Sequence, residues 1–507
     1  MAMYLFSELP YAAALQSHYV LDRCSNCFAL TDSVHCDQGC SAAVYCSESC
    51  MQADRLWHAN ECMAYRRQKQ EEGTCMPMIM IVRLLGRMIS RRRVDNGEVV
   101  LSENFPEHLV KNRRFDDLIS HDREKKREWN KKEAIWEVFI KFFKTTPLAN
   151  VTPKDVFHVH NVYEINGFCI ASMSDNAIGQ FEYLGFGVYL NASRFNHSCR
   201  PSMLFSFYGR RLVVKKLQNY DHESKWDVGQ LQRGPPDLAC QESMTKKEFE
   251  SLTFNYGFPA DVSTVSLTKH RQQSLKDRYF FRCRCEICCD KKAVKFETHA
   301  SSVECPQCAQ PYVWRKKLWN SKMWLKKLCK CRVKIDLSNI LNGADVQRDL
   351  RQLDADGDYA RLDHLAKADR YWHPVYNLRY GQLNEQVMRC ELAKYFQVKD
   401  ALGELSNDLL KPVLEAGEKM LKSYMHYSEP SYICMATFFD NLAGVYLKWQ
   451  EGNETAKRKR AYELCLLSAL VWRYVGYSEC EECMLRVSKI LKNEIEMLQS
   501  SDHDGDL

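Results

Sequence analysis

The chain has 507 residues, of which 45% are hydrophobic and 27% are charged, and its formal net charge is +6. This length is too great for a single hydrophobic core, so we expect roughly three or four domains. The composition is typical of a soluble globular protein. The longest apolar runs, such as Met76–Val82, fall far short of the ~18–20 residues that span a bilayer. The mild positive charge neither requires nor excludes a nucleic-acid partner.

Residues 1–22 are predicted to form a strand and a turn, with Tyr4 and Phe6 in the strand and Pro10 before a segment of small residues. This start has no basic n-region and carries Glu8 early, which is not the pattern of a secretion signal. The chain holds 24 cysteines. Cysteines in such number without a secretion signal indicate a reducing compartment and metal binding.

Residues 23–62 are predicted to form a zinc module, because cysteine and histidine recur there in closely spaced pairs. The pairs are Cys24-x2-Cys27, Cys36-x3-Cys40, Cys46-x3-Cys50 and His58-x3-Cys62. A structural zinc site is tetrahedral and takes four thiolate or imidazole ligands, so this set makes two closed sites without a position for a catalytic water. The spacing leaves the connectivity open and favours an interleaved arrangement, with Cys24, Cys27, Cys46 and Cys50 on one zinc and Cys36, Cys40, His58 and Cys62 on the other. The alternative is a disulfide framework, which needs an oxidising compartment.

Residues 63–155 are predicted to be mainly helical. Apolar side chains recur at three- and four-residue steps from Met78 to Arg93 and again from Trp129 to Phe143, which is the period of an amphipathic helix. We interpret the charged stretch between them, Asp122–Glu128, as the solvated face of a helix. A nucleic-acid-binding patch is the alternative for this stretch.

Residues 156–265 are predicted to form a β-rich core, since short apolar or alternating runs are bounded there by Gly, Asn, Ser and Pro. A polar loop interrupts this core at 219–250. The segment 300–335 has the cysteine spacing of a zinc ribbon, with incidental thiols as the alternative. Its four cysteines are Cys305, Cys308, Cys329 and Cys331. Residues 340–500 are predicted to form a helical C-terminal domain, with hairpin patterns that resemble tetratricopeptide pairs.

A further set of metal ligands lies in and after the β-rich core. The core contains Asn196-His197-Ser198-Cys199, and a Cys-x-Cys-x2-Cys run lies within residues 278–290. The thiols of this run are Cys283, Cys285 and Cys288, and Cys199 would complete a tetrahedral site. Such a zinc would fasten the later segment to the core, so metal binding would help to assemble a pocket.

The Asn-His-Ser-Cys stretch, with Tyr256 and Tyr279 downstream and the cysteine run, resembles the SET fold of protein lysine methyltransferases. The zinc module resembles a MYND domain set into that fold, so the chain resembles the SET-and-MYND (SMYD) family. The resemblance implies a multidomain α+β fold. Its expected parts are an N-terminal SET fragment at 1–22, a MYND module at 23–62, a helical insert at 63–155, a SET core at 156–265, a zinc-bound post-SET segment at 278–290 and a helical C-terminal domain at 340–500.

The resemblance also implies S-adenosylmethionine and zinc as cofactors and assigns roles to residues. Tyr256 and Tyr279 match tyrosines of the methyl-transfer site and are the expected catalytic residues. The expected cofactor-binding residues are Glu164, Asn166 (on a strand), Asn196, His197, Tyr256 and Phe281. Aromatic rings can enclose the stem of a lysine and attract a positive sulfonium, and positioning carries much of a methyl transfer.

The chain departs from the family pattern at three places. SET-and-MYND proteins usually begin with a Gly-x-Gly segment, whereas the first glycine here is Gly39. Loss of that segment is expected to weaken cofactor binding, because glycine permits close approach of the backbone. The loop at 219–250 replaces the family's Gly-Glu turn, and Arg194 and Ser202 stand where a small or apolar residue and an Asn are usual.

The expected function is S-adenosylmethionine-dependent protein-lysine N-methylation of histone or non-histone lysines, with a role in regulating transcription. The expected partners are a lysine-containing protein tail and proline-rich peptides bound by the MYND module, and we expect a monomer in nucleus and cytoplasm without membrane or direct nucleic-acid contact. One alternative is a catalytically impaired adaptor or corepressor that binds proline-rich peptides. Another is DNA binding by the zinc module, although residues 24–62 hold few basic side chains.

Overall fold

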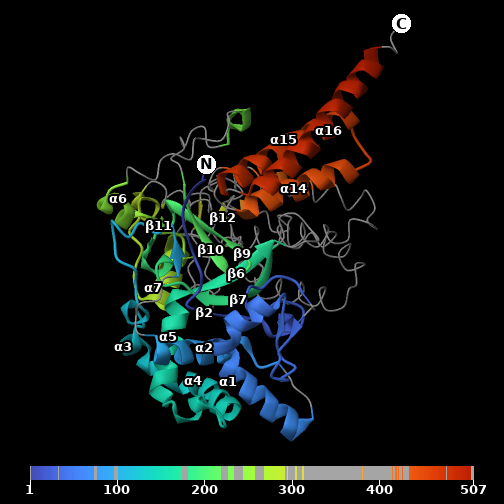
Figure 1. Ribbon diagram of the computed structural model, residues 1–507. Coiled ribbons are helices and arrows are strands. Elements are labelled where there is room, and N and C mark those ends of the chain that lie inside the picture. Colours follow the sequence, from blue (N-terminus) through green and yellow to red (C-terminus); the bar gives the residue numbers. More distant parts are fainter. Residues whose placement is uncertain are drawn as a thin grey trace, which may run out of the picture. The chain divides into compact units, whose positions relative to one another are not determined.

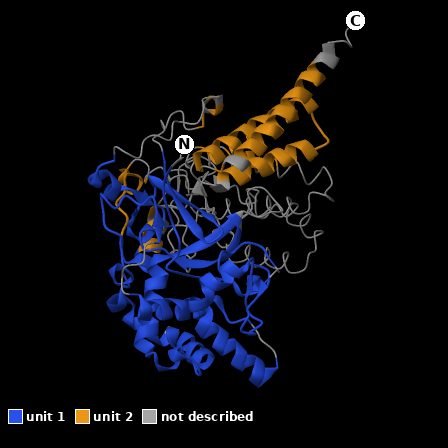
Figure 2. Cartoon of the chain, viewed as in Figure 1, with its two compact units in different colours: residues 1–218, 236–256, 276–281 blue, residues 219–235, 257–275, 282–507 orange. Residues whose placement is uncertain are grey.

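The structure is a computed structural model (Figure 1). It describes residues 2–31, 34–73, 77–95, 101–173, 181–217, 226–232, 244–256, 268–291 and 433–503 except 476, with isolated positions between 294 and 425. Three predictions therefore lie wholly or partly outside the described residues: the zinc ribbon with Cys305, Cys308, Cys329 and Cys331, most of the loop at 219–250 and the first part of the helical C-terminal domain. The chain divides into two compact units (Figure 2), one made of residues 1–218, 236–256 and 276–281 and the other of residues 219–235, 257–275 and 282–507.

Within the described residues, the first unit contains three antiparallel sheets and a short parallel ladder. The smallest sheet pairs β3 (Val34–His35) with β4 (Val44–Tyr45). In the four-stranded sheet, the order is β5 (Ser102–Glu103), β1 (Ala2–Glu8), β10 (Arg211–Leu217) and β9 (Met203–Tyr208). In the three-stranded sheet, the order is β2 (Ala12–Leu15), β7 (Phe181–Val188) and β6 (Gly167–Met173). The parallel ladder joins β8 (Asn196–His197) to β11 (Thr253–Phe254). The segment predicted to form a β-rich core, residues 156–265, contains β6, β7, β9 and β10, so the prediction of strands there is confirmed.

Strand β2 was not predicted, because its sequence, Ala-Ala-Ala-Leu, reads only as a segment of small residues. All four of its residues are buried, and they pair with β7 in the register Ala12↔Val188 to Leu15↔Gly185. Small side chains allow helix α2 (Met80–Val94) to lie close on this strand (Figure 1). Tertiary packing rather than intrinsic propensity therefore makes this segment a strand.

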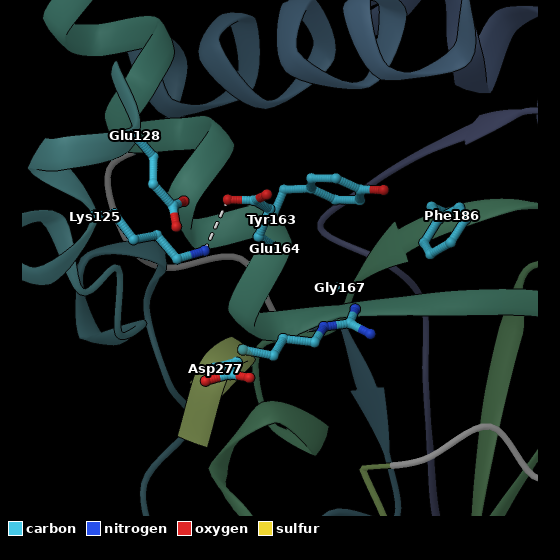
Figure 3. A pocket seen from close by; sticks show the side chains of 8 residues that line it. Lys125, Glu128, Tyr163, Glu164, Gly167, Phe186 and Asp277 are labelled. Atoms are coloured by element: carbon cyan, nitrogen blue, oxygen red, sulfur yellow. Dashed lines mark hydrogen bonds and ion pairs between the residues drawn. The ribbon is translucent and has the colours of Figure 1, made fainter. Parts of the chain in front are cut away.

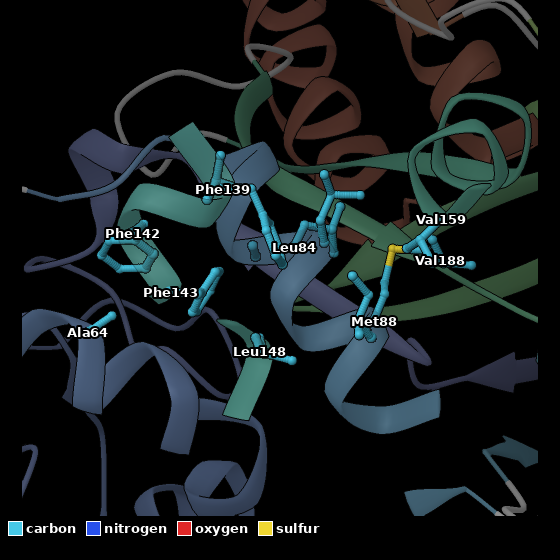
Figure 4. Packing of buried hydrophobic residues seen from close by; sticks show 14 of the residues in the cluster. Ala64, Leu84, Met88, Phe139, Phe142, Phe143, Leu148, Val159 and Val188 are labelled. Carbon is cyan, nitrogen blue, oxygen red and sulfur yellow. The ribbon is translucent and has the colours of Figure 1, made fainter. Parts of the chain in front are cut away.

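Helix α2 also packs against α1 (Glu48–Glu72), α4 (Trp129–Phe143) and α5 (Pro153–Asn166). The predicted helices at 78–93 and 129–143 agree with α2 and α4. Their apolar faces share one core, whose buried residues include Leu84 and Met88 of α2 and Phe139, Phe142 and Phe143 of α4 (Figure 4). Ordinary caps fix the helix ends: the Ser47 hydroxyl accepts from the backbone N–H of Cys50, and Thr152 and Asp155 form a capping box.

The interpretation of Asp122–Glu128 as a solvated helix face is wrong for Lys125. Helix α3 (Asp122–Lys125) buries this side chain, whose exposed fraction is 4%. The Lys125 ammonium lies 2.7 Å from the Glu164 carboxylate of α5. The sequence shows a run of charges, but it cannot show that one of them faces a half-buried acid thirty-nine positions away on another helix.

The second unit is described mainly by three helices, α14 (Ile433–Lys448), α15 (Glu454–Val475) and α16 (Ser478–His503). Helix α15 packs against both of the others, and its Trp472 is fully buried. The Ser468 hydroxyl donates to the Ala436 carbonyl of α14, and Arg473 pairs with Glu481 of α16. Among the described helices, none combines the length and the apolarity that crossing a bilayer requires.

Gly86 provides a test of how tightly α2 and α4 pack. A Cβ atom at Gly86 would lie 2.5 Å from Cζ of the buried Phe143 ring, so Gly86→Ala must displace that ring. We expect the substitution to lower the free energy of unfolding by about 1–3 kcal/mol, measured by urea denaturation. The matched control is Gly444→Ala in α14, where a new Cβ meets no atom within 4 Å and should stabilise the helix. Equal effects of the two substitutions would contradict this account.

Candidate functional site

The first predicted zinc set comes together in the structure. The sulfur atoms of Cys24, Cys27, Cys46 and Cys50 lie within 4.8 Å of one another. The Cys27–Cys46 and Cys46–Cys50 sulfur separations are 3.6 and 3.5 Å. A tetrahedron of ~2.3 Å Zn–S bonds has edges of about 3.8 Å, so this set is close to the size that zinc requires.

The second set also comes together and is buried. Its ligand atoms, from Cys36, Cys40, His58 and Cys62, lie within 4.8 Å of one another. The Cys36 and Cys62 sulfurs are 3.8 Å apart, and Nε2 of His58 lies 3.3 Å from the Cys40 sulfur. The two groups are those of the interleaved arrangement, which is therefore confirmed as the grouping that the fold builds. Each described cysteine is a free thiol, so no disulfide forms among these residues.

A third set groups the residues predicted for the clip after the β-rich core. The sulfur atoms of Cys199, Cys283, Cys285 and Cys288 lie within 4.8 Å of one another. Two of the sets consist of four thiols, and the second set consists of three thiols and one imidazole. These are ligands that zinc prefers, and four of them leave no open coordination position. The chemistry of these donor sets therefore suits structural zinc.

An aromatic cluster surrounds His197 in the first unit. The ring centroids of Tyr256 and Tyr279 are 4.8 Å apart, and Phe281 lies edge-on to Tyr256 at 6.2 Å. The imidazole of His197 lies 5.4 Å from the Tyr256 ring and 6.0 Å from the Phe281 ring. The structure thus brings together four residues that the resemblance assigned to catalysis or cofactor binding, although they come from segments that are far apart in the sequence.

Hydrogen bonds fix the orientation of this cluster. The backbone N–H of Tyr256 donates to Nδ1 of His197 at 3.0 Å, so the ring proton of a neutral His197 lies on Nε2, which faces the Cys199 sulfur at 3.4 Å. The Tyr256 hydroxyl donates to the Phe195 carbonyl at 2.8 Å. Burial raises the pKa of Tyr256 to about 12, and burial also raises the pKa of Tyr279. Both phenols therefore keep their protons at neutral pH.

Glu8 supports the segment that leads into Asn196 and His197, and the sequence analysis missed this role. Its carboxylate is fully buried and accepts the backbone N–H groups of Asn191 and Ala192, each at 2.9 Å. Ala192 begins the short 3-10 turn η5 (Ala192–Arg194), which precedes β8. Burial raises the pKa of Glu8 to about 7, although the backbone N–H groups act to lower it. A lone acid in an otherwise apolar strand was the signal that could have revealed it.

The structure places Asn166 at the end of helix α5, not on a strand as predicted, and strand β6 starts only at Gly167. A residue at the end of a helix can bond the carbonyls of the preceding turn. The side-chain amide of Asn166 donates to the carbonyls of Ile119 and Val162, each at 2.8 Å. Asn166 is therefore held by the chain itself, and its side chain is buried.

Glu164 lies beside a cavity of about 400 Å³ (Figure 3). The residues that line this cavity are Lys125, Glu128, Tyr163, Glu164, Gly167, Phe186, Asp277 and Arg278. Lys125 and Lys132 both lie 2.7 Å from one Glu164 oxygen. Burial acts to raise the pKa of Glu164, but His160 and the two lysines outweigh burial and lower it below its usual range. Glu164 is therefore ionised and neutralised from within the chain.

The two departures in the core motif have structural explanations. The Arg194 guanidinium lies over the Phe105 ring, 5.1 Å from its centroid, and donates to the Lys111 carbonyl. The Ser202 hydroxyl accepts the backbone N–H of Thr253 at 2.8 Å, beside the β8–β11 ladder. Neither side chain contacts the aromatic cluster through these bonds, so both substitutions are accommodated by local packing.

Comparison with known proteins identifies relatives that match more than half of the chain. The chain is 24% identical over 329 residues to histone-lysine N-methyltransferase Smyd1 of Mus musculus, which covers 65% of this chain and 59% of Smyd1. It is 25% identical over 321 residues to a SET and MYND domain-containing protein of Dictyostelium discoideum, covering 56% and 55%. It is 21% identical over 308 residues to N-lysine methyltransferase SMYD2 of Mus musculus, covering 60% and 59%.

The chain is similar to SET-and-MYND proteins over more than half of its length. No family model matches the chain. The matched region spans between one half and three fifths of each relative's own length. Because one fold can host several functions, the activity of this chain has to be argued from its own site.

The buried carboxylate of Glu8 predicts a measurable pH dependence. Its folded pKa of about 7 lies above the ordinary value of 4.5, so the folded protein keeps a proton that the unfolded chain has released. The stabilising contribution is present below pH 4.5 and is lost as pH rises to about 7. Relative to Glu8→Gln, we expect the free energy of unfolding of the natural chain to fall by about 3 kcal/mol over this interval.

The measurement is chemical denaturation of both proteins at several pH values, with Glu103→Gln as the control. Glu103 is an exposed acid on the neighbouring strand β5, where its carboxylate pairs with Arg211. Its substitution should leave the pH dependence close to that of the natural chain. Parallel pH curves for the natural chain and Glu8→Gln would show that Glu8 does not titrate in this way.

Proposed function

We propose that the chain is an S-adenosylmethionine-dependent protein-lysine N-methyltransferase that acts on histone or non-histone lysines. The observation that carries this proposal is the aromatic cluster of Tyr256, Tyr279 and Phe281 around His197. The names of the relatives, histone-lysine and N-lysine methyltransferases, support the same reaction class. A protein with no lysine to accommodate would not need aromatic rings gathered at this motif.

The residues of the cluster fit a positively charged cofactor and a lysine side chain. When bound, S-adenosylmethionine would supply a methyl group activated by its sulfonium charge. Tyr256, Tyr279 and Phe281 would hold the sulfonium end and the lysine stem, because the face of an aromatic ring attracts cations. Asn196 has an exposed side chain beside His197 and would supply polar contacts to the cofactor. The three cysteine sets would hold zinc in a structural role.

Tyr256 is suited to orienting the amine rather than to removing its proton. Its hydroxyl hydrogen is committed to the Phe195 carbonyl, so the oxygen presents lone pairs that can accept an N–H of the substrate amine. Its pKa of about 12 keeps the phenol neutral at physiological pH. The lysine amine would have to lose its proton before transfer, and burial of the amine beside the rings would favour its neutral form. The amine held by Tyr256 would then be the nucleophile, and a bound S-adenosylmethionine would supply the methyl group.

A second candidate, a catalytically impaired adaptor or corepressor, is favoured by a different observation. Glu164 is neutralised by Lys125 and Lys132, and Asn166 is bonded to two backbone carbonyls. Two of the six expected cofactor contacts are therefore engaged within the chain. In this alternative the zinc module binds proline-rich peptides, and the helices of the second unit bind other proteins.

For either function, we propose that the protein works as a monomer in nucleus and cytoplasm and takes part in regulating transcription. Its substrate would be a lysine-containing tail of another protein, and proline-rich peptides would bind the zinc module. These proposals are supported only by the similarity to SET-and-MYND proteins. Fractionation of cells that express the tagged chain would test the location, and light scattering of the purified protein would test the monomer.

The first test is calorimetric binding of S-adenosylmethionine to the zinc-loaded chain. We expect micromolar affinity, which Asn196→Ala should weaken by about tenfold through loss of a hydrogen bond. Because Asn196 is exposed, its substitution should leave the unfolding temperature unchanged. Absence of cofactor binding would overturn the methyltransferase proposal and favour the adaptor.

The second test separates binding from catalysis through Tyr256→Phe. Cofactor affinity should be largely retained, whereas transfer to lysine should fall on the order of 100-fold because the amine loses its orienting contact. The matched control is Tyr189→Phe. Tyr189 is a buried core tyrosine whose hydroxyl also donates to a backbone carbonyl, that of Arg210. Equal losses of activity in the two variants would mean that stability, not orientation, explains the effect.

A further inference from the structure

Helix α2 carries three arginines at four-residue steps, and all three are buried. Their exposed fractions are 4% for Arg83, 4% for Arg87 and 9% for Arg91. A step of four places successive side chains on one face of a helix. Arg83 donates to the Leu15 carbonyl of β2, and Arg91 donates to the Tyr11 carbonyl just before it. Both outer arginines thus bond to backbone carbonyls, whereas the middle one, Arg87, bonds to side-chain carboxylates.

Arg87 binds two buried carboxylates at once. Its Nη1 and Nη2 donate to the two oxygens of Asp54 at 2.9 and 3.2 Å. Its Nε and Nη2 donate to the two oxygens of Glu61 at 2.6 and 3.0 Å. Asp54 and Glu61 lie two turns apart on helix α1, so one guanidinium bridges a single face of that helix. A planar fork of N–H donors is the group that can meet two carboxylates in this way.

Both carboxylates also bond to other side chains of the zinc module. One Glu61 oxygen lies 3.2 Å from Nδ1 of His58, whose Nε2 lies 3.3 Å from the Cys40 sulfur in the second cysteine set. The Asp54 carboxylate accepts the Tyr45 hydroxyl at 3.1 Å. A carboxylate on the far nitrogen of a ligating imidazole fixes its tautomer and the direction of its ring. Glu61 therefore presents Nε2 of His58 to the metal, provided that Glu61 itself is held.

We propose that Arg87 is the positioning residue of the second metal set: by clamping Asp54 and Glu61, it holds His58 in the orientation that binds zinc. Without Arg87, two carboxylates would remain buried on one helix face without a cation between them, which is strongly unfavourable. Glu61 would then turn away from this face, and His58 would lose its support. The metal affinity of residues 36–62 is thus determined partly by a side chain outside the zinc module.

The same geometry makes zinc binding and helix docking interdependent. Helix α2 is fastened to the segment around β2 by Arg83 and Arg91, and to α1 by Arg87. If zinc binding favours the docking of α1 on α2, then that docking must favour zinc binding by the same free energy. Removal of zinc should therefore weaken the contact of α1 with α2, and loss of Arg87 should lower the zinc affinity of the second set. Neither effect requires the methyltransferase activity, so both can be tested whether or not that activity exists.

The experiment replaces zinc by cobalt in the full chain and follows metal loss to a chelator. A site with three thiolates and one imidazole can be distinguished from an all-thiolate site by its cobalt absorption bands. In Arg87→Met, we expect the affinity of the mixed site to fall about 10–100-fold, while the all-cysteine sites change little. Arg87→Lys should restore only part of the affinity, because an ammonium cannot bind both carboxylates bidentately.

The matched control is Arg83→Met, which removes a buried arginine of the same helix whose hydrogen bonds go to the backbone carbonyls of Met78 and Leu15. An equal loss of cobalt from the mixed site in Arg83→Met, or an unchanged mixed site in Arg87→Met, would overturn the proposal. If Arg87→Met fails to fold, Glu61→Gln provides the second variant, since it keeps Arg87 paired with Asp54. Glu61→Gln should weaken the mixed site selectively, and an unchanged site would also overturn the proposal.

Discussion

The buried guanidinium of Arg87 is the constraint on which much of the first unit depends. An arginine side chain cannot lose its proton inside a protein, so its charge must be matched wherever it is buried. Here Asp54 and Glu61 match it, and both lie on the helix that also supplies His58 and Cys62 to the second metal set. Replacing such a network by apolar side chains can be neutral for stability, whereas removing one member is costly. The network therefore selects one docking of α1 on α2 rather than simply adding stability.

The side chains of the aromatic cluster are also held in fixed orientations, but by hydrogen bonds to backbone groups instead of ion pairs. Backbone groups, not ionised side chains, fix its members: the Tyr256 N–H binds His197, and the Tyr256 hydroxyl binds the Phe195 carbonyl. Glu8 holds the turn that leads into this segment through two further backbone N–H groups. The bonds at the cluster itself join neutral groups: a backbone N–H to an imidazole nitrogen, and a phenol to a backbone carbonyl. The geometry that we propose for orienting an amine is thus present in the unbound chain, which would lower the entropic cost of binding.

Sequence reasoning was successful where the signal was local. The cysteine spacing predicted both sets of the zinc module, and apolar periodicity predicted α2 and α4. It failed where the decisive partner lies far along the chain. Strand β2 exists because α2 covers it, Lys125 is buried because Glu164 faces it, and Asn166 ends a helix instead of starting a strand. Sequence reasoning assigned no role to the buried arginines of α2, since their carboxylate and carbonyl partners carry no local pattern.

Glu164 is where the enzyme and adaptor interpretations separate physically. Two lysines on one carboxylate keep the carboxylate ionised and leave the three side chains together with a net positive charge. A cofactor contact to Glu164 would have to compete with Lys125, which reaches it from another helix, or displace it. The cavity beside this pair gives such a lysine somewhere to move (Figure 3). A rearrangement of Lys125 therefore costs one charge-assisted hydrogen bond, about 1.5–3 kcal/mol, which the binding of a charged cofactor can offset. The ion pair therefore sets the energetic cost that a cofactor contact at Glu164 has to exceed.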